Sequence, residues 1–140
     1  MFKNILVPTD LTENSRKALD IAAKMATQNN PVTITLIHVV EIIENTEEEE
    51  FKDFYDRLKK RAESGMKELA DQYRDENTYI EQVIIFGKRV KEIVKYAYDK
   101  DIDLIILGSH RIDKVDKTQG WATISYRVGI LSHCPVLMVK

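Results

Sequence analysis

The residues best suited to chemistry lie in one stretch, LGSHRIDKVDKTQGWATISYRV, which spans 107–128. Gly108-Ser109-His110 follows an apolar run directly, and a helical pattern begins near the end of the stretch. Consecutive backbone N–H groups in such a loop, together with those at a helix start, can surround a phosphate group. Arg111 and Ala122 stand where loops of this kind usually have glycine. The stretch therefore indicates an anion-binding loop of altered composition.

The three histidines do not point to an enzyme. No two of them have the i, i+4 spacing of a helical metal pair, and we interpret His38 and His133 as structural. His110 is expected to line a pocket beside the loop. Ser109, His110 and Asp10 are the residue types of a catalytic triad, but adjacent residues seldom face each other and no Gly-x-Ser-x-Gly elbow is present. We therefore predict no catalytic residue and no metal-ligating residue.

The composition restricts the class of protein. The chain has 140 residues, the size of one compact domain over 1–140. Its 21 basic and 23 acidic residues give a net charge of -2, so no positive field favours nucleic acid. A single cysteine, Cys134, gives no internal disulfide framework and suits a reducing compartment. Because no apolar run approaches the length of a membrane span, we expect a soluble, cytoplasmic protein without a membrane partner.

Five short apolar stretches have the character of strands. They are NILVP at 4–8, VTITLIHVV at 32–40, YIEQVIIF at 79–86, DLIILG at 103–108 and PVLMVK at 135–140. Most are continuous runs and do not alternate with polar residues. Strands of a parallel sheet read this way, because helices bury them on both faces.

Helical patterns separate these strands. Thr12 is the expected N-cap of a first helix over 12–28, and apolar residues recur at helical spacing over about 47–75. Two more patterns cover 88–100 and 123–132. Strands that alternate with helices predict a single doubly wound α/β domain, with about four helices on both faces of a parallel sheet. In such folds ligands bind beyond the carboxyl ends of the strands.

Motifs along the whole chain resemble those of the universal stress protein family. They are ILVPTD near the start, then LIHVV, FGKRVKEIVKYA, DLIILGSH and, near the end, CPVLMV, which follow that family's order. The resemblance implies a five-stranded parallel sheet in the order 3-2-1-4-5, with the winding reversed between the first and fourth strands. That reversal would place Pro8-Thr9-Asp10 beside Gly108.

The last third of the chain departs from the pattern of ATP-binding family members. That pattern is Gly, two residues, Gly, nine residues, then Gly-Ser or Gly-Thr before a hydrophobic and a hydroxyl residue. Here Thr123-Ile124-Ser125 matches its end, whereas Arg111 and Ala122 replace the second and third glycines with ten residues between them. A Cβ at either position obstructs a phosphate if the backbone needs positive φ, although the Arg111 guanidinium adds a charged donor. A modified site and a lost site both stay open.

If the site binds a nucleotide, the resemblance implies ATP with Mg²⁺, or a related adenine nucleotide, as the cofactor. Asp10 and the Pro8-Thr9 backbone would contact the adenosine, and the main chain of Val39 would contact the adenine. The other expected contacts, at the phosphates and along the pocket wall, are Leu107, Gly108, His110, Arg111, Thr123, Ile124 and Ser125. Capping of backbone groups is the alternative role for Asp10, Thr123 and Ser125, and exposure to solvent is the alternative for Arg111.

Two functions follow from this resemblance. The first is a nucleotide-binding module that acts in stress response through a dimer and an unidentified protein partner, with at most slow incidental ATP hydrolysis. The second is a nucleotide-free dimeric interaction module, which the altered glycines favour. An adenylating enzyme on a related scaffold is a third interpretation, but this short chain has little room for its substrate pocket. In both leading interpretations we expect a homodimer, because the last strand, 135–140, exposes its backbone ladder. The resemblance implies that this strand pairs antiparallel with its copy.

Overall fold

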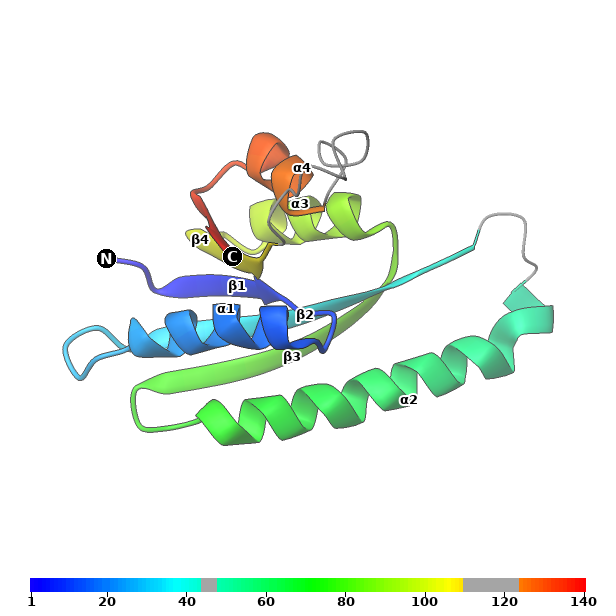
Figure 1. Cartoon of the computed structure of the whole chain (residues 1–140), viewed down its shortest axis with the longest axis horizontal. Coiled ribbons are helices and arrows are strands. Elements are labelled where there is room, and N and C mark those ends of the chain that lie inside the picture. The colour runs from blue at the N-terminus through cyan, green and yellow to red at the C-terminus, as the bar shows by residue number, and fades with distance from the viewer. Residues whose placement is uncertain (44–47, 110–123) are drawn as a thin grey trace.

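The computed structural model describes residues 1–43, 48–109 and 124–140 (Figure 1). Strands and helices alternate along these residues. In chain order they are β1 (Asn4–Pro8), α1 (Glu13–Lys24), β2 (Val32–Glu41), α2 (Glu48–Tyr73), β3 (Thr78–Gly87), α3 (Arg89–Asp99), β4 (Leu104–Gly108), α4 (Ile124–Leu131) and β5 (Val136–Val139). Every strand and helix predicted from the sequence is present.

The strands form one parallel, five-stranded sheet in the order β3-β2-β1-β4-β5. The predicted doubly wound α/β fold with this strand order is confirmed. β2 and β3 pair along their whole lengths, whereas β1 and β4 pair only at Ile5 with Leu104 and at Leu6 with Ile105. Beyond Leu6 the two strands part, which opens the sheet where the winding reverses. This is the place where doubly wound folds bind ligands.

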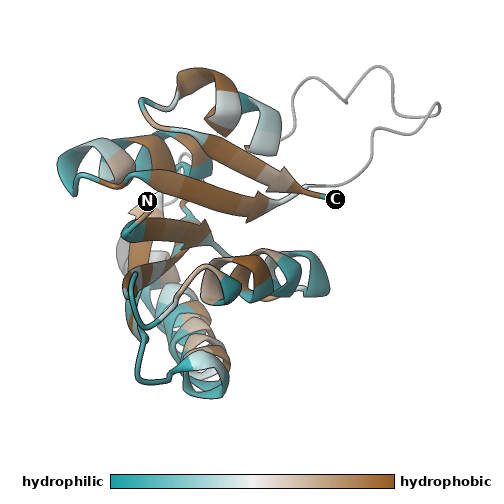
Figure 2. Cartoon of the chain, turned by 90° about the vertical axis from the view of Figure 1, so that its left-hand side faces the viewer, coloured by the Kyte–Doolittle hydropathy of each residue, from teal (hydrophilic) through white to brown (hydrophobic). Residues whose placement is uncertain are grey.

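Alternate residues of each strand face two separate cores, as the two-residue period of a strand requires. Ile5 and Ile34 pack with α1 and α2 on one face, whereas Leu6, Ile37 and Ile105 pack with α3 and α4 on the other. Figure 2 shows the hydrophobic strands between helices that carry both hydrophobic and hydrophilic residues. This burial on both faces explains the continuous apolar runs of the sequence. Within the described part of the chain, no helix has the length and apolar character needed to cross a membrane.

The first helix is shorter than predicted. Helical spacing continues to Gln28, but α1 ends at Lys24. The backbones of Thr27 and Asn30 exchange two hydrogen bonds of 3.0 and 3.1 Å, and the chain reverses there before Pro31. Asparagine and proline favour such turns, so local turn chemistry overrides the helical pattern in the last residues.

Candidate functional site

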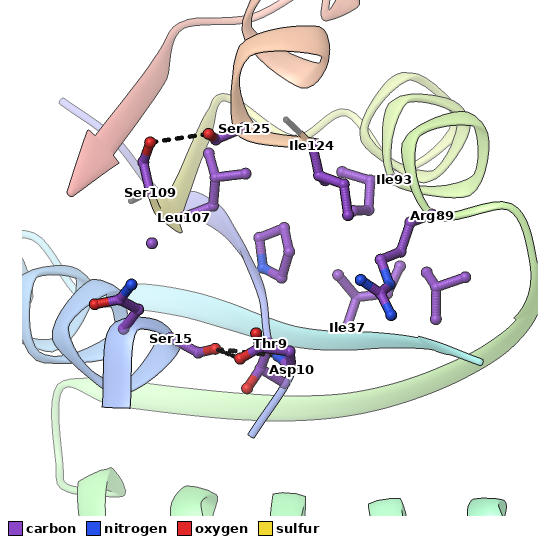
Figure 3. Close-up of a pocket in the computed structure, with 14 residues that line it drawn as sticks. Thr9, Asp10, Ser15, Ile37, Arg89, Ile93, Leu107, Ser109, Ile124 and Ser125 are labelled. Atoms are coloured by element: carbon purple, nitrogen blue, oxygen red, sulfur yellow. Dashed lines mark hydrogen bonds between the residues drawn. The ribbon is translucent and has the colours of Figure 1, made fainter. Parts of the chain in front are cut away.

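A cavity of about 240 Å³ lies at the carboxyl ends of the strands, beside the point where β1 and β4 part (Figure 3). Its walls come from the turn after β1, from the ends of β2 and β4, and from the first turns of α1, α3 and α4. Its volume is close to the lower end of the roughly 300 to 1,000 Å³ typical of small-molecule sites. The position and size suit one small ligand, or a part of a larger one.

Gly108, the last residue of β4, lets α1 approach the sheet. A Cβ built on Gly108 would lie 2.5 Å from the backbone oxygen of Asn14 and 2.7 Å from its carbonyl carbon. Both atoms belong to the first turn of α1, so only a residue without a Cβ fits here. The close approach brings the start of α1, and with it the turn after β1, against the end of β4. Gly108 is therefore needed for the packing of α1 against β4.

The turn after β1 is organised around the Asp10 carboxylate. Its Oδ1 accepts hydrogen bonds from the Thr12 backbone N–H at 3.0 Å, from the Thr12 hydroxyl at 2.5 Å and from the Ser15 hydroxyl. Thr12 occupies the N-cap position predicted for it, but its side chain makes no capping hydrogen bond of its own. Asp10 therefore does cap this turn, one of the two roles considered for it. These three hydrogen bonds all reach the same oxygen, Oδ1.

The environment of Asp10 keeps it ionised. Partial burial raises the pKa of this carboxyl, but the hydrogen bonds from Ser15 and Thr12 outweigh burial and hold the pKa below its ordinary value of 3.8. A carboxylate with a lowered pKa is a weak base at neutral pH and a good hydrogen-bond acceptor. Asp10 thus suits binding better than proton transfer.

The neighbours of Asp10 hold the turn in a strained shape. Leu11 has a φ of 67°, in the left-handed region, which costs a residue with a Cβ on the order of 1–2 kcal/mol. Its N–H donates to the Thr9 hydroxyl at 3.0 Å, and the Thr9 N–H donates to the Ile37 carbonyl at 2.9 Å. The Thr9 carbonyl accepts from Nδ1 of His38 at 2.7 Å. His38 therefore has the structural role predicted for it, because its ring fixes the backbone beside the cavity.

Two buried serines close the opposite side of the cavity. Ser109 directly follows β4 and Ser125 lies in the first turn of α4, and their Oγ atoms are 2.9 Å apart. Ser109 is only 2% exposed and Ser125 only 5%, and the Ser109 N–H also donates to the Val139 carbonyl at 2.7 Å. The Ser125 hydroxyl, expected at a phosphate, thus contacts Ser109 and joins α4 to the sheet.

Apolar side chains separate these two polar sides. Ile37 and Val39 from β2 face Ile93 from α3 and Ile124 from α4, and these four residues form what we call the apolar slot. Arg89, the first residue of α3, lies at one end of the slot, and Figure 3 shows Ser109 at the opposite side of the cavity. A flat apolar group fits between such walls, with polar groups at its edges.

A model of the universal stress protein family matches residues 1–140. The chain belongs to this family. Universal stress protein MJ0577 of Methanocaldococcus jannaschii is a relative, 29% identical over all of this chain and 96% of its own length. The solved structure of MJ0577 superposes with a TM-score of 0.83 at 31% identity, again over all of this chain and 96% of that one.

Two further structures of universal stress proteins contain nucleotides. One is a complex with cAMP, with a TM-score of 0.65 at 19% identity over 99% of this chain and 97% of that one. The other is the Arabidopsis thaliana protein At3g01520 with AMP bound, with a TM-score of 0.71 at 17% identity over 99% of this chain and 91% of that one. At these identities the likeness to this universal stress protein is one of fold.

The structure brings together most of the site residues predicted from the sequence. Those that line the cavity are Pro8, Thr9, Asp10, Val39, Leu107, Gly108, Ile124 and Ser125. Three predicted residues, His110, Arg111 and Thr123, lie outside the described residues, as does Ala122. The effect of Arg111 and Ala122 on nucleotide binding therefore stays a prediction. Within the described ranges, no group of three or more His, Cys, Asp or Glu side chains could hold a metal ion.

The ligand contacts predicted from the sequence left out several residues of the cavity wall. They are Asn14, Ser15, Ile37, Arg89, Ile93 and Ser109. Two of them carried a usable signal: Ile37 is two residues before Val39 and so shares its face of the strand, and Arg89 comes two residues after Gly87, where a strand ends. The contact of Asn14 with Gly108 had no signal in the sequence, since it depends on how α1 packs on β4.

Proposed function

We propose that this universal stress protein binds an adenine nucleotide, such as ATP or AMP, in the cavity between β1 and β4, and that it acts by binding and not by catalysis. The observation that carries the proposal is the arrangement of the cavity, in which an apolar slot lies between an ionised carboxylate and a pair of buried serines. The cAMP and AMP complexes of relatives with this fold support it.

Each part of a nucleotide has a matching part of the wall. The slot takes the base between apolar side chains, and Oδ2 of Asp10 accepts a hydrogen bond from a ribose hydroxyl. The phosphates extend toward Gly108 and Ser109, where the first N–H groups of α4 and the positive end of its dipole favour an anion. Mg²⁺ would arrive on the phosphates of ATP. Hydrolysis is slow in this proposal, because the carboxylate at the site is a weak base.

A variant whose side chain fills the apolar slot tests the proposal. The variant Ile124→Phe puts a larger side chain into the slot, and Ile130→Phe makes the same change on the same helix at a residue that is 78% exposed. At a nucleotide concentration of 100 times Kd, binding stabilises the folded state by about 2.7 kcal/mol, which a thermal scan detects easily. We expect ATP and AMP to raise the Tm of the wild type and of Ile130→Phe, but not that of Ile124→Phe. No rise in the wild type at millimolar nucleotide would refute the proposal.

A homodimer is the second part of the proposal, and in the nucleotide-free alternative it is the main one. β5 lies at one edge of the sheet, and the exposed apolar residues Leu131 and Leu137 come from α4 and β5 beside that edge. Antiparallel pairing of two β5 strands would give the edge backbone N–H and C=O groups hydrogen-bond partners and would cover these side chains. Leu137→Lys places a charge there, and sedimentation equilibrium should show a monomer where the wild type is a dimer. A wild-type monomer at high concentration would exclude the dimer.

A further inference from the structure

Arg89 stands at the end of the cavity where the base would lie. It is the first residue of α3, and in Figure 3 its side chain reaches from the helix toward Ile37 on β2. Its side chain is 42% exposed, so the guanidinium is in contact with both the cavity and the solvent. Neither the proposed ribose contact nor the proposed phosphate contacts use it.

The guanidinium of Arg89 is held only weakly. Its Nε lies 3.9 Å from Oε1 of Glu41, whose side chain is 54% exposed, at the far end of β2. Exposed ion pairs of this kind contribute about 0–1 kcal/mol. Within the described residues the Arg89 side chain has no other polar partner. A ligand can therefore engage the guanidinium at little cost.

The surroundings of Arg89 favour contact with a flat ring. Ile93 lies one helical turn after Arg89 on the same face of α3, and Ile37 and Val39 form the opposite wall. The guanidinium is planar, stacks on aromatic faces and attracts the electrons of a ring. Phosphate groups placed toward Gly108 and Ser109 would lie away from Arg89, because Figure 3 shows Ser109 at the opposite side of the cavity from Arg89.

We propose that Arg89 is a further ligand-binding residue, which leaves Glu41 and stacks its guanidinium on the purine base of the bound nucleotide. The inference rests on the proposed nucleotide site and adds a cation to its apolar slot. It makes the base, and not the phosphates, the part of the ligand that Arg89 recognises. When no ligand is present, the ion pair with Glu41 keeps the guanidinium at the end of the slot.

The test compares Arg89→Leu with the wild type, using calorimetry for ATP and competition against ATP for adenosine, which has no phosphate. Leucine keeps the apolar stem and removes the planar cation. We expect both affinities to fall by the same factor, about 2- to 30-fold, and the factor for ATP to be the same at 50 and 300 mM salt. Lys91→Leu removes an exposed cation two residues further along α3 and should change neither affinity.

The other outcomes distinguish a failure of this inference from a failure of the proposed function. If Arg89→Leu binds ATP and adenosine as the wild type does, the inference is wrong while the proposed function stands. A loss for ATP alone that shrinks with added salt would also overturn it, since Arg89 would then contact a phosphate. A wild type that binds neither ligand refutes the proposed function first and this inference with it. Thermal unfolding of each variant without ligand checks that the fold is unchanged.

Discussion

The close approach of α1 to β4 makes a sharp prediction for Gly108→Ala. The new Cβ would lie 2.5 and 2.7 Å from two backbone atoms of Asn14, where ordinary contact begins at 3.4 Å. The shortfall at the nearer atom is 3.4 minus 2.5, or 0.9 Å. Backbone atoms cannot rotate aside as a side chain can, so α1 and β4 must separate.

The cost follows from what this separation disturbs. α1 and β4 share one buried core, in which Leu19 and Ala22 pack with Ile106. Extra atoms forced into such packing usually destabilise a protein by about 1–3 kcal/mol. For a chain of this size that corresponds to a decrease in Tm of roughly 3 to 15 °C.

Urea unfolding followed by circular dichroism measures the effect, with all variants at one protein concentration. Gly129→Ala is the matched control, because a Cβ at Gly129 in α4 meets nothing within 4 Å. Alanine is the better helix former by about 0.8–1 kcal/mol, so this variant should be more stable than the wild type. The same substitution is thus expected to have opposite signs at the two glycines. A Gly108→Ala protein as stable as the wild type, with an unchanged m-value, would refute the argument.

Three further predictions concern polar contacts. Burial raises the pKa of Asp10 but its hydrogen bonds lower it by more, so the stability that Asp10 contributes is present above about pH 4 and is lost as pH falls through the lowered pKa. Urea midpoints measured from pH 6 to 2.5 should therefore fall less steeply for Asp10→Asn than for the wild type, and parallel curves would contradict this. A double-mutant cycle of Ser109→Ala and Ser125→Ala should give a coupling of about 1 kcal/mol, whereas a coupling near zero would mean that the hydroxyls do not interact. Tyr73→Phe removes the hydrogen bond to Asp20 that links α2 to α1 and should cost about 0.5–1.5 kcal/mol in the same assay, with no loss arguing against this link.

The order of strands and helices could be predicted from the sequence because it depends on local patterns. Continuous apolar runs such as DLIILG can be buried only as strands covered on both faces, and apolar residues at helical spacing form the helices between them. The general location of the site followed as well, since Pro8-Thr9-Asp10 and Gly108 both come directly after strands. Where a turn competes with a helical pattern, as after Lys24, the local pattern gave the wrong end of the helix.

Contacts between distant parts of the chain were decided only by the tertiary structure. The role of Gly108 against Asn14, the hydrogen bond between Ser109 and Ser125, and the direction of Arg89 toward the cavity all depend on how α1, α3 and α4 pack on the sheet. No spacing in the sequence encodes these contacts, because a few tenths of an ångström in packing determine whether two groups meet. The sequence by itself thus determined which elements form and at which end of the sheet the candidate site lies. The packing of the helices decided which side chains line the cavity there.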